Sequence, residues 1–149
     1  MIATIVPMRD EHIDALMPFE REMFGTEAWT KSAYRTELAD AEHRNYLVAE
    51  DADGSLIGWA GVLVIADSAE ILTIGTVPAA RRRGIARALL VALIDAARHR
   101  GAVEMFLEVR VDNDAARAFY LAEGFTEIGQ RPGYYDLGRI DAAVMHRAV

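Results

Sequence analysis

The segment Val77–Leu90 (VPAARRRGIARALL) places three consecutive arginines and a glycine between an apolar run and the start of a helix-like pattern. A strand, a loop and a helix N-terminus in this order form an anion site, because the first backbone N–H groups of a helix lack internal partners and the helix dipole is positive there. Gly84 lets a ligand approach the backbone closely, and Ala86 keeps the adjacent surface small. We therefore expect a pyrophosphate group to bind this loop.

Two common phosphate motifs do not describe the loop. No Gly-Lys-Ser/Thr follows it, which excludes the P-loop of nucleoside triphosphatases, and it lacks the second and third glycines of the dinucleotide fingerprint. Taken alone, this segment could also be an exposed, basic helix N-terminus that binds no ligand.

A second group of polar residues follows downstream. Asn113 and Tyr120 are seven positions apart, close to two helical turns, so that an amide and a phenol lie near one face. The short helix that carries them follows the strand with Glu108, which adds a carboxylate beside the proposed phosphate loop. Taken alone, the pair also fits a structural reading, in which Asn113 only caps the helix and Tyr120 is a core aromatic residue.

The strands that must position these groups are read from apolar and β-branched runs. Such runs cover Ile2–Val6, Tyr46–Glu50, Leu56–Ile65, Ile71–Val77 and Val103–Arg110. The turn Asp51–Gly54 (DADG) predicts a hairpin between the second and third of them. The tail Phe125–Val149 predicts two further strands around a loop rich in Gly, Pro and Tyr.

Helical spacing predicts four helices. The first begins at Asp10 as N-cap, and we expect Pro18 to kink or split it. The others cover Lys31–Ala39, Gly84–Arg100 and residues 114–123. The third helix has a buried stripe of Ile85, Leu89, Ala92, Leu93 and Ala96, with Gly101 as a left-handed C-terminal cap. A strand, this helix and a strand make a right-handed crossover between parallel strands, so we expect an α+β fold with one mixed sheet.

Composition limits the class of protein. The chain has 149 residues, 52% apolar and 26% charged, which fits one domain over residues 1–149. It has no cysteine, which excludes disulfides and thiolate chemistry and favours the cytoplasm. We expect no export signal and no membrane span, because the longest apolar run, Trp59–Ala66, is far shorter than the roughly 20 residues required. A net charge of −7 disfavours nucleic acid and favours a basic partner.

We expect no metal site. The four histidines share no metal-ligand spacing, and no cluster of carboxylates accompanies them. These histidines are His12, His43, His99 and His146.

The two polar constellations together resemble a known superfamily. The pattern Arg81-x-x-Gly84-x-Ala86 after a strand, followed by Asn113, Ala116, Tyr120 and Gly124-Phe125, resembles the acetyl-CoA motifs of the GNAT superfamily of N-acetyltransferases. Further segments resemble its bacterial ribosomal-protein alanine N-acetyltransferases: Trp29-Thr30, Phe106–Arg110 (FLEVR), Arg131–Tyr135 (RPGYY), Asp141-Ala142 and Met145. The likeness spans nearly the whole chain.

The resemblance implies a fold and a place for acetyl-CoA. The fold has three layers, with a central mixed and mostly antiparallel sheet, a V-shaped opening between two parallel strands, and about four flanking helices. Acetyl-CoA would lie in the V. Its contacts would come from the backbone of Ile74, Gly75 and Thr76, from the N–H groups of Arg82, Arg83, Gly84, Ile85, Ala86 and Arg87, and from Asn113 and Tyr120. Trp29, Tyr134 and Tyr135 would border the pocket for the acceptor.

The resemblance also implies that Glu108 is the general base and Tyr120 the general acid. Acetyl transfer from a thioester needs a neutral amine, and an α-amino group with a pKa of about 7.7 to 8.0 is neutral far more often at pH 7 than a lysine at about 10.4. We expect a backbone N–H near residues 74–76 to bind the carbonyl oxygen, with Gly75 easing a bulge in the strand. Glu104, on the same side of its strand as Glu108, is the main rival for the base.

Three functions are compatible with these residues. The first is acetylation of a protein N-terminus, preferably alanine, with small-subunit ribosomal protein S18 as the expected target. The second is acetylation of a small amine such as a polyamine, an aminoglycoside or an amino acid. The third is a non-catalytic module that binds acetyl-CoA. Acetyl-CoA is a partner in each, whereas neither a metal, nor direct contact with nucleic acid, nor a membrane is expected.

Overall fold

A seven-stranded sheet forms the centre of the computed structural model, which describes residues 3–149. The order of its strands is β1-β2-β3-β4-β5-β7-β6. They are β1 (Thr4–Pro7), β2 (Arg44–Glu50), β3 (Leu56–Ile65), β4 (Ser68–Thr76), β5 (Glu104–Arg110), β6 (Thr126–Tyr135) and β7 (Ile140–Ala148). Of the pairs within residues 3–149, β4 with β5 is parallel and the others are antiparallel. The predicted mixed, mostly antiparallel sheet is confirmed.

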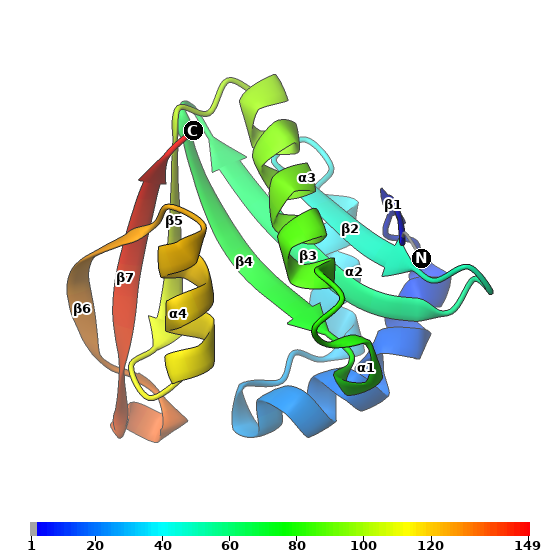
Figure 1. Ribbon diagram of the computed structural model, residues 1–149, viewed down its shortest axis with the longest axis horizontal. Coiled ribbons are helices and arrows are strands. Elements are labelled where there is room, and N and C mark those ends of the chain that lie inside the picture. Colours follow the sequence, from blue (N-terminus) through cyan, green and yellow to red (C-terminus); the bar gives the residue numbers. More distant parts are fainter. Residues whose placement is uncertain (1–2) are drawn as a thin grey trace.

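Helices cover both faces of this sheet. The helices are α1 (Asp10–Phe24), α2 (Lys31–Ala39), α3 (Ile85–His99) and α4 (Asp114–Ala122), with short 3-10 turns η1 (Gly25–Glu27), η2 (Pro78–Ala80) and η3 (Asp136–Gly138). In Figure 1, α3 and α4 lie in front of the sheet, whereas α1 and α2 lie behind it. The result is the expected three-layer arrangement.

The parallel strands β4 and β5 are paired over only part of their length. Residues Ser68–Glu70 pair with Glu104–Phe106, and beyond these positions the two strands separate into a V that widens toward their C-terminal ends (Figure 1). A bulge in β4 lies next to the point of separation, because Ile71 pairs with Val62 and Thr73 with Gly61, which leaves Leu72 without a partner on β3. A bulge bends a strand and increases its twist, which fits the divergence.

The bulge was predicted at Gly75, and that position is wrong. Gly75 pairs regularly with Trp59, and a Cβ atom on Gly75 would lie 2.8 Å from the Trp59 ring. The glycine is therefore needed for packing against the tryptophan and not for a bulge.

Helix α1 differs from the prediction in two respects. It begins after Arg9 and not after Asp10, because the His12 ring accepts the Arg9 N–H at 2.9 Å and Asp10 already lies in the first turn. It also continues through Pro18 without a break. Buried residues on both sides of the proline, including Leu16 and Glu20, hold the helix against the sheet despite the hydrogen bond that proline removes.

Helix α3 packs on β3 and fixes the loop that precedes it. Ile85, Leu89 and Leu93 are buried as predicted, while Leu90, Ile94 and Ala97 complete the buried face in place of the half-buried Ala92 and Ala96. A Cβ atom on Gly58 of β3 would lie 2.9 Å from Ile85 and 3.0 Å from Leu89, so the glycine permits this close contact. Gly101 after the helix has a φ of +92°, as expected for a left-handed cap.

The segment Arg131–Tyr135 belongs to a strand and not to the predicted loop. Strand β6 extends to Tyr135, and the turn before β7 is limited to η3 with Arg139. Pro132 is accommodated because β6 is an edge strand and its pairing with β7 is irregular between Arg131 and Tyr135.

Candidate active site

A cavity of about 520 Å³ lies where β4 and β5 separate. The two strands contribute Ile71–Ile74 and Leu107–Arg110 to its walls. The rest of the lining comes from α1, the segment after it, the loop before α4, α4 itself and the end of β6. These residues are Glu20, Met23, Phe24, Glu27, Trp29, Asp112, Asn113, Ala116, Tyr120 and Tyr135. Because these residues come from both sides of the sheet, the cavity passes through the opening of the V.

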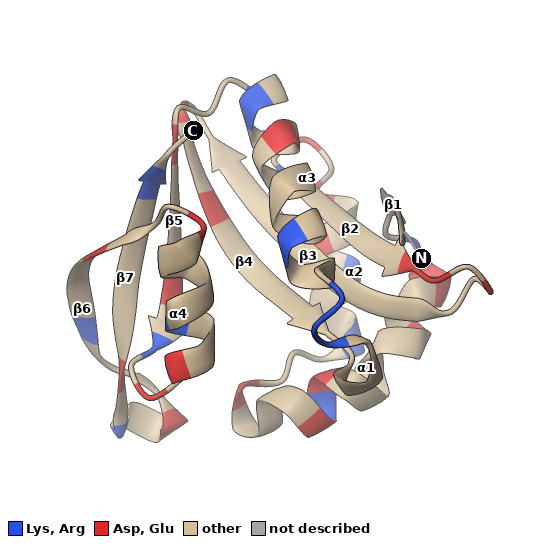
Figure 2. Ribbon diagram, in the orientation of Figure 1, with Lys and Arg blue, Asp and Glu red and all other residues tan. Residues whose placement is uncertain are grey.

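A smaller cavity of about 230 Å³ lies at the loop between β4 and α3. It is lined by Thr76, Ala80, Arg81, Arg82, Gly84, Ile85, Ala86, Arg87 and Phe119. Figure 2 shows the arginines of this loop as a continuous positive segment at the start of α3. The predicted anion site and this cavity therefore coincide.

The backbone of the loop is shaped to receive an anion. Arg82 and Gly84 have φ angles of +66° and +76°, and consecutive turns of this kind direct N–H groups into a concavity. The first hydrogen bond within α3 runs from the Ala88 N–H to the Gly84 carbonyl. The N–H groups of residues 85–87 therefore have no carbonyl acceptor within the helix. The Thr76 hydroxyl, which lines the same cavity, is buried and finds no hydrogen-bond partner in the described part of the chain, residues 3–149. These features fit a polar, phosphate-bearing ligand.

Glu108 on β5 lines the larger cavity. Its carboxylate accepts from Arg131, with Nη1 at 3.2 Å from Oε1 and 3.4 Å from Oε2. Its backbone carbonyl accepts a hydrogen bond from the Tyr135 hydroxyl at 3.2 Å. The rival Glu104 does not line this cavity, and its Oε1 lies 3.1 Å from Nε2 of His146. Of the two carboxylates, only Glu108 can reach a ligand in the V.

Tyr120 reaches the cavity from α4. Its ring is buried against Phe125, at a centroid distance of 5.6 Å, and the structure gives its hydroxyl no partner within residues 3–149. Burial raises the pKa of Tyr120 well above its ordinary value, so the hydroxyl remains a donor at neutral pH.

Asn113 also lines the cavity, and its Oδ1 accepts the Ala116 N–H at 3.1 Å, which confirms the predicted cap.

Of the three residues predicted to border the acceptor pocket, two line the cavity and one does not. Trp29 lines the cavity and packs on Tyr34 at a centroid distance of 4.9 Å. Tyr135 lines it too, and burial raises its pKa to about 12. Tyr134 lies outside it, with the Arg131 guanidinium 4.2 Å from the centre of its ring.

Two of the predicted cofactor-binding residues line neither cavity. Arg83 turns to the hairpin between β2 and β3, where its guanidinium donates two hydrogen bonds of 3.0 Å to Asp51. Gly75 lies under Trp59. The prediction concerns the backbone N–H and carbonyl groups of Arg83 and Gly75, and it stays a prediction.

Four charged residues of the cavity were absent from the sequence prediction: Glu20, Glu27, Arg110 and Asp112. Glu20 is 1% exposed and accepts hydrogen bonds from the Tyr34 hydroxyl at 2.5 Å and from the Trp29 N–H at 3.1 Å. Burial raises the pKa of Glu20 above its ordinary value. A signal was present, because Glu20 follows Leu16 by four residues on the apolar face of α1.

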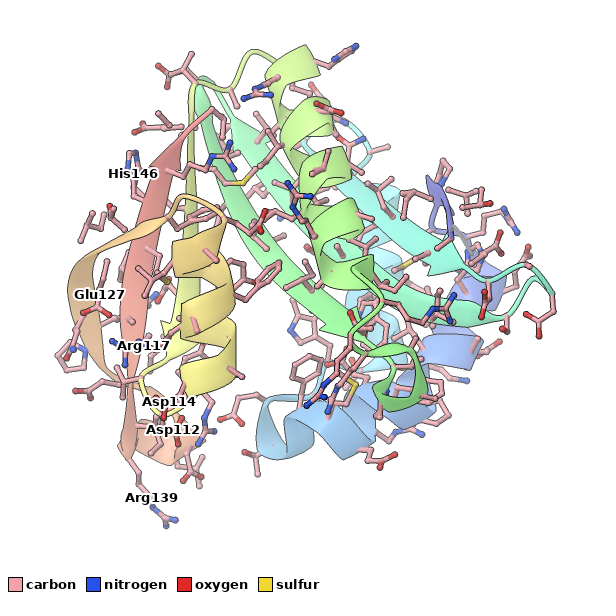
Figure 3. All side chains as sticks on the ribbon, in the orientation of Figure 1. Asp112, Asp114, Arg117, Glu127, Arg139 and His146 are labelled. Carbon is pink, nitrogen blue, oxygen red and sulfur yellow. The ribbon has the colours of Figure 1, made fainter. Side chains whose placement is uncertain are left out.

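Asp112, which lies between β5 and α4, contacts Arg110 of β5. It accepts two hydrogen bonds of 2.9 Å from Arg110 while also lining the cavity. Figure 3 shows Asp112 and Asp114 together at the N-terminal end of α4. In the same view Arg117 of α4 lies beside Glu127 of β6, and their ion pair of 2.8 Å ties this helix to the edge of the sheet.

Among residues 3–149, no group of three or more His, Cys, Asp or Glu side chains is arranged to hold a metal ion. None of the helices described is both long enough and apolar enough to cross a membrane.

Comparison with known proteins gives consistent matches. Residues 10–125 match the model of the acetyltransferase (GNAT) family. The chain is 41% identical over 133 residues to N-alpha-acetyltransferase RimI of Mycobacterium tuberculosis, covering 86% of this chain and 81% of the relative. It is 34% identical over 119 residues to the ribosomal protein bS18-alanine N-acetyltransferase of Escherichia coli, covering 78% of each. The crystal structure of the ribosomal-protein-S18-alanine N-acetyltransferase from Escherichia coli superposes with a TM-score of 0.86 at 29% identity, covering 99% and 94% of the two chains.

Proposed function

The chain belongs to the GNAT acetyltransferase family and is an acetyl-CoA-dependent N-acetyltransferase; from this premise we propose that it acetylates the N-terminal amine of a protein, preferably alanine, with ribosomal protein bS18 as the target. The names of the relatives from Mycobacterium tuberculosis and Escherichia coli support this acceptor class. The observation that carries the proposal is the cavity in the V, in which Glu108 and Tyr120 face the same space as Trp29 and Tyr135.

Acetyl-CoA supplies a thioester whose acetyl group is activated for transfer. We assign its pyrophosphate to the N–H groups of residues 82–87, because the left-handed turns and the start of α3 present donors there. The buried Thr76 hydroxyl supports this assignment, since a bound polar ligand would satisfy it. The backbone of Ile74, Gly75 and Thr76, together with Asn113, would hold the part of the cofactor that enters the V.

Glu108 is proposed to accept the proton that the acceptor amine loses. An α-amino group has a pKa of about 7.7 to 8.0, so a carboxylate, directly or through one water, needs to supply only a modest deprotonation. Arg131 is the residue that an incoming ammonium group would replace beside this carboxylate, because Arg131 is more than half exposed and Glu108 is not.

Tyr120 is proposed to act on the sulfur. Its hydroxyl has no hydrogen-bond partner among residues 3–149 and stays protonated, so it can donate a hydrogen bond to the departing thiolate. For the carbonyl oxygen, the bulge at Leu72 is a better source of an N–H donor than residues 74–76. A bulged residue is left out of the ladder, and Leu72 lines the cavity.

Mass spectrometry of acetyl transfer to two peptides tests the acceptor. One peptide carries the N-terminal sequence of bS18 with a free alanine and its lysines replaced, and the other is blocked at its N-terminus and contains a lysine. We expect label on the first peptide alone. Label on the second alone, or on neither while polyamines or amino acids are acetylated, would refute the proposed acceptor and favour a small amine.

A further inference from the structure

Glu27 joins the two arms of the V at the acceptor side of the cavity. It lies in η1, next to α1, and its Oε1 accepts the Asp136 N–H from η3 at 2.8 Å. Its Oε2 accepts a hydrogen bond from Arg110 of β5 at 3.3 Å. The three residues are far apart in sequence and belong to opposite sides of the opening between β4 and β5.

The turn that Glu27 holds has an unfavourable backbone conformation. Asp136 and Leu137 have φ angles of +51° and +54°, in the left-handed region that L residues with side chains rarely occupy. Leu137 is 91% exposed, so burial of its side chain does not compensate for this conformation. Two adjacent residues of this kind persist only where the surroundings hold them. The Glu27 carboxylate supplies such a hold through the Asp136 N–H.

The same turn positions a residue of the cavity wall. Tyr135 directly precedes Asp136, its ring lines the cavity, and its hydroxyl donates to the backbone carbonyl of Glu108 at 3.2 Å. The Arg110 guanidinium lies 6.0 Å from the centre of the Tyr135 ring. A displacement of the turn would therefore move both Tyr135 and its contact with the strand that carries Glu108.

We propose that Glu27 is a positioning residue of the acceptor site, whose carboxylate clamps the turn Asp136–Gly138 across the mouth of the cavity and thereby fixes Tyr135. The kinetic part of this inference rests on the proposed acetylation of peptides. The structural part, that a hydrogen bond from the Asp136 N–H to Glu27 holds a strained turn, does not depend on which acceptor the protein acetylates.

Three substitutions distinguish a positioning role of Glu27 from direct contact with the acceptor. Glu27→Ala removes the acceptor of the Asp136 N–H. Glu27→Gln retains an oxygen acceptor for this N–H, but it loses the charge and the acceptor of the Arg110 hydrogen bond. Arg110 keeps its two bonds to Asp112 in either variant. Leu137→Gly removes an exposed side chain and allows the positive φ at little cost, so it stabilises the turn without the clamp.

The first measurement is amide hydrogen exchange at Asp136 by NMR, which needs no substrate. We expect exchange in Glu27→Ala to be faster than in the wild type by roughly tenfold or more, since a hydrogen bond to a charged group is lost. Glu27→Gln should stay close to the wild type, and Leu137→Gly should restore part of the protection to Glu27→Ala. Unchanged exchange in Glu27→Ala, or equal acceleration in Glu27→Gln, would overturn the clamp.

The second measurement is steady-state kinetics with the alanine peptide. We expect Glu27→Ala to raise the KM for the peptide while leaving the KM for acetyl-CoA unchanged, and Leu137→Gly to reverse part of this rise. Failure of Leu137→Gly to do so would overturn the positioning role of Glu27. If the wild type acetylates no peptide, the proposed function fails, and the exchange experiment still decides on the clamp.

Discussion

At the scale of single residues, two carboxylates on one face of β5 give a matched test of the base. Glu108 lines the cavity and Glu104 does not, although both stand on the same strand and both contact a basic partner. We expect Glu108→Gln to lower kcat by about 10²- to 10⁴-fold, the usual worth of general base catalysis, with little change in acetyl-CoA affinity. Glu104→Gln should keep the wild-type kcat. Equal losses in the two variants would remove the assignment of Glu108.

The buried carboxylate of Glu20 leads to a prediction about stability and pH. Its pKa in the folded protein is raised, chiefly by burial, above the ordinary value of 4.5. A raised pKa means that the folded state holds the proton more tightly than the unfolded state. The stabilising contribution of protonation is therefore complete below about pH 4.5 and is lost as the pH rises through the folded value.

Urea unfolding of the wild type and Glu20→Gln over a series of pH values measures this effect. Groups other than Glu20 cancel in the difference between the two free energies of unfolding. We expect the wild type to lose stability relative to Glu20→Gln as the pH rises above about 4.5. A difference that is independent of pH, or that grows in favour of the wild type, contradicts a raised pKa.

At the scale of elements, the loop before α3 offers a second matched comparison. Gly84 and Gly101 stand at opposite ends of this helix with φ angles of +76° and +92°. Within residues 3–149, a Cβ atom at either position would have no contact closer than 4 Å beyond its chain neighbours. Substitution by alanine imposes a similar backbone cost at both, about 1 to 2 kcal/mol. Only Gly84 lies at the proposed pyrophosphate site.

Calorimetric titration with acetyl-CoA distinguishes the two glycines. We expect Gly84→Ala to weaken binding by about tenfold or more, because the displaced N–H groups no longer converge on the phosphates. Gly101→Ala should be destabilised to a similar extent and bind as the wild type does. Wild-type affinity in Gly84→Ala would exclude this loop as the pyrophosphate site.

The sequence predicts those elements whose form depends on local pattern. The bounds of α2 and β3 agree with the prediction because their apolar spacing and flanking turns are unambiguous. The parallel pair β4 and β5 follows from the order strand, helix, strand, because a helix of this length carries the chain back so that the second strand runs in the same direction as the first. The predicted residues Glu108 and Tyr120 line the cavity. Their directions were predictable, because the residue period of a strand or a helix determines which side chains share a face.

The remaining features depend on contacts between distant segments. The bulge at Leu72 is set by how β4 pairs with β3, so that Gly75 in the sequence suggested the wrong place. The contact of Glu27 with Asp136 joins residues 109 positions apart, and no local pattern relates them. Only the completed fold brings such groups together.

At the scale of the whole molecule, we expect the cofactor to affect two otherwise similar helices differently. Helices α2 and α4 each have nine residues and each buries one side chain, Tyr34 in α2 and Tyr120 in α4. The two tyrosines differ in their neighbours. The Tyr34 hydroxyl donates a hydrogen bond to Glu20 and accepts one from Trp59. The Tyr120 hydroxyl has no hydrogen-bond partner within residues 3–149. Helix α4 stands on the arm of the V that carries β5.

A ligand that fills the V should therefore stabilise α4 and leave α2 almost unaffected, since binding to the folded state stabilises the elements that contact the ligand. Hydrogen exchange with mass spectrometry, with and without acetyl-CoA, measures both helices in one sample. We expect slower exchange across α4 and the first turn of α3, and no change in α2. Protection of α2 without α4 would place the cofactor on the α1 side of the sheet and would contradict the assigned roles of Asn113 and Tyr120.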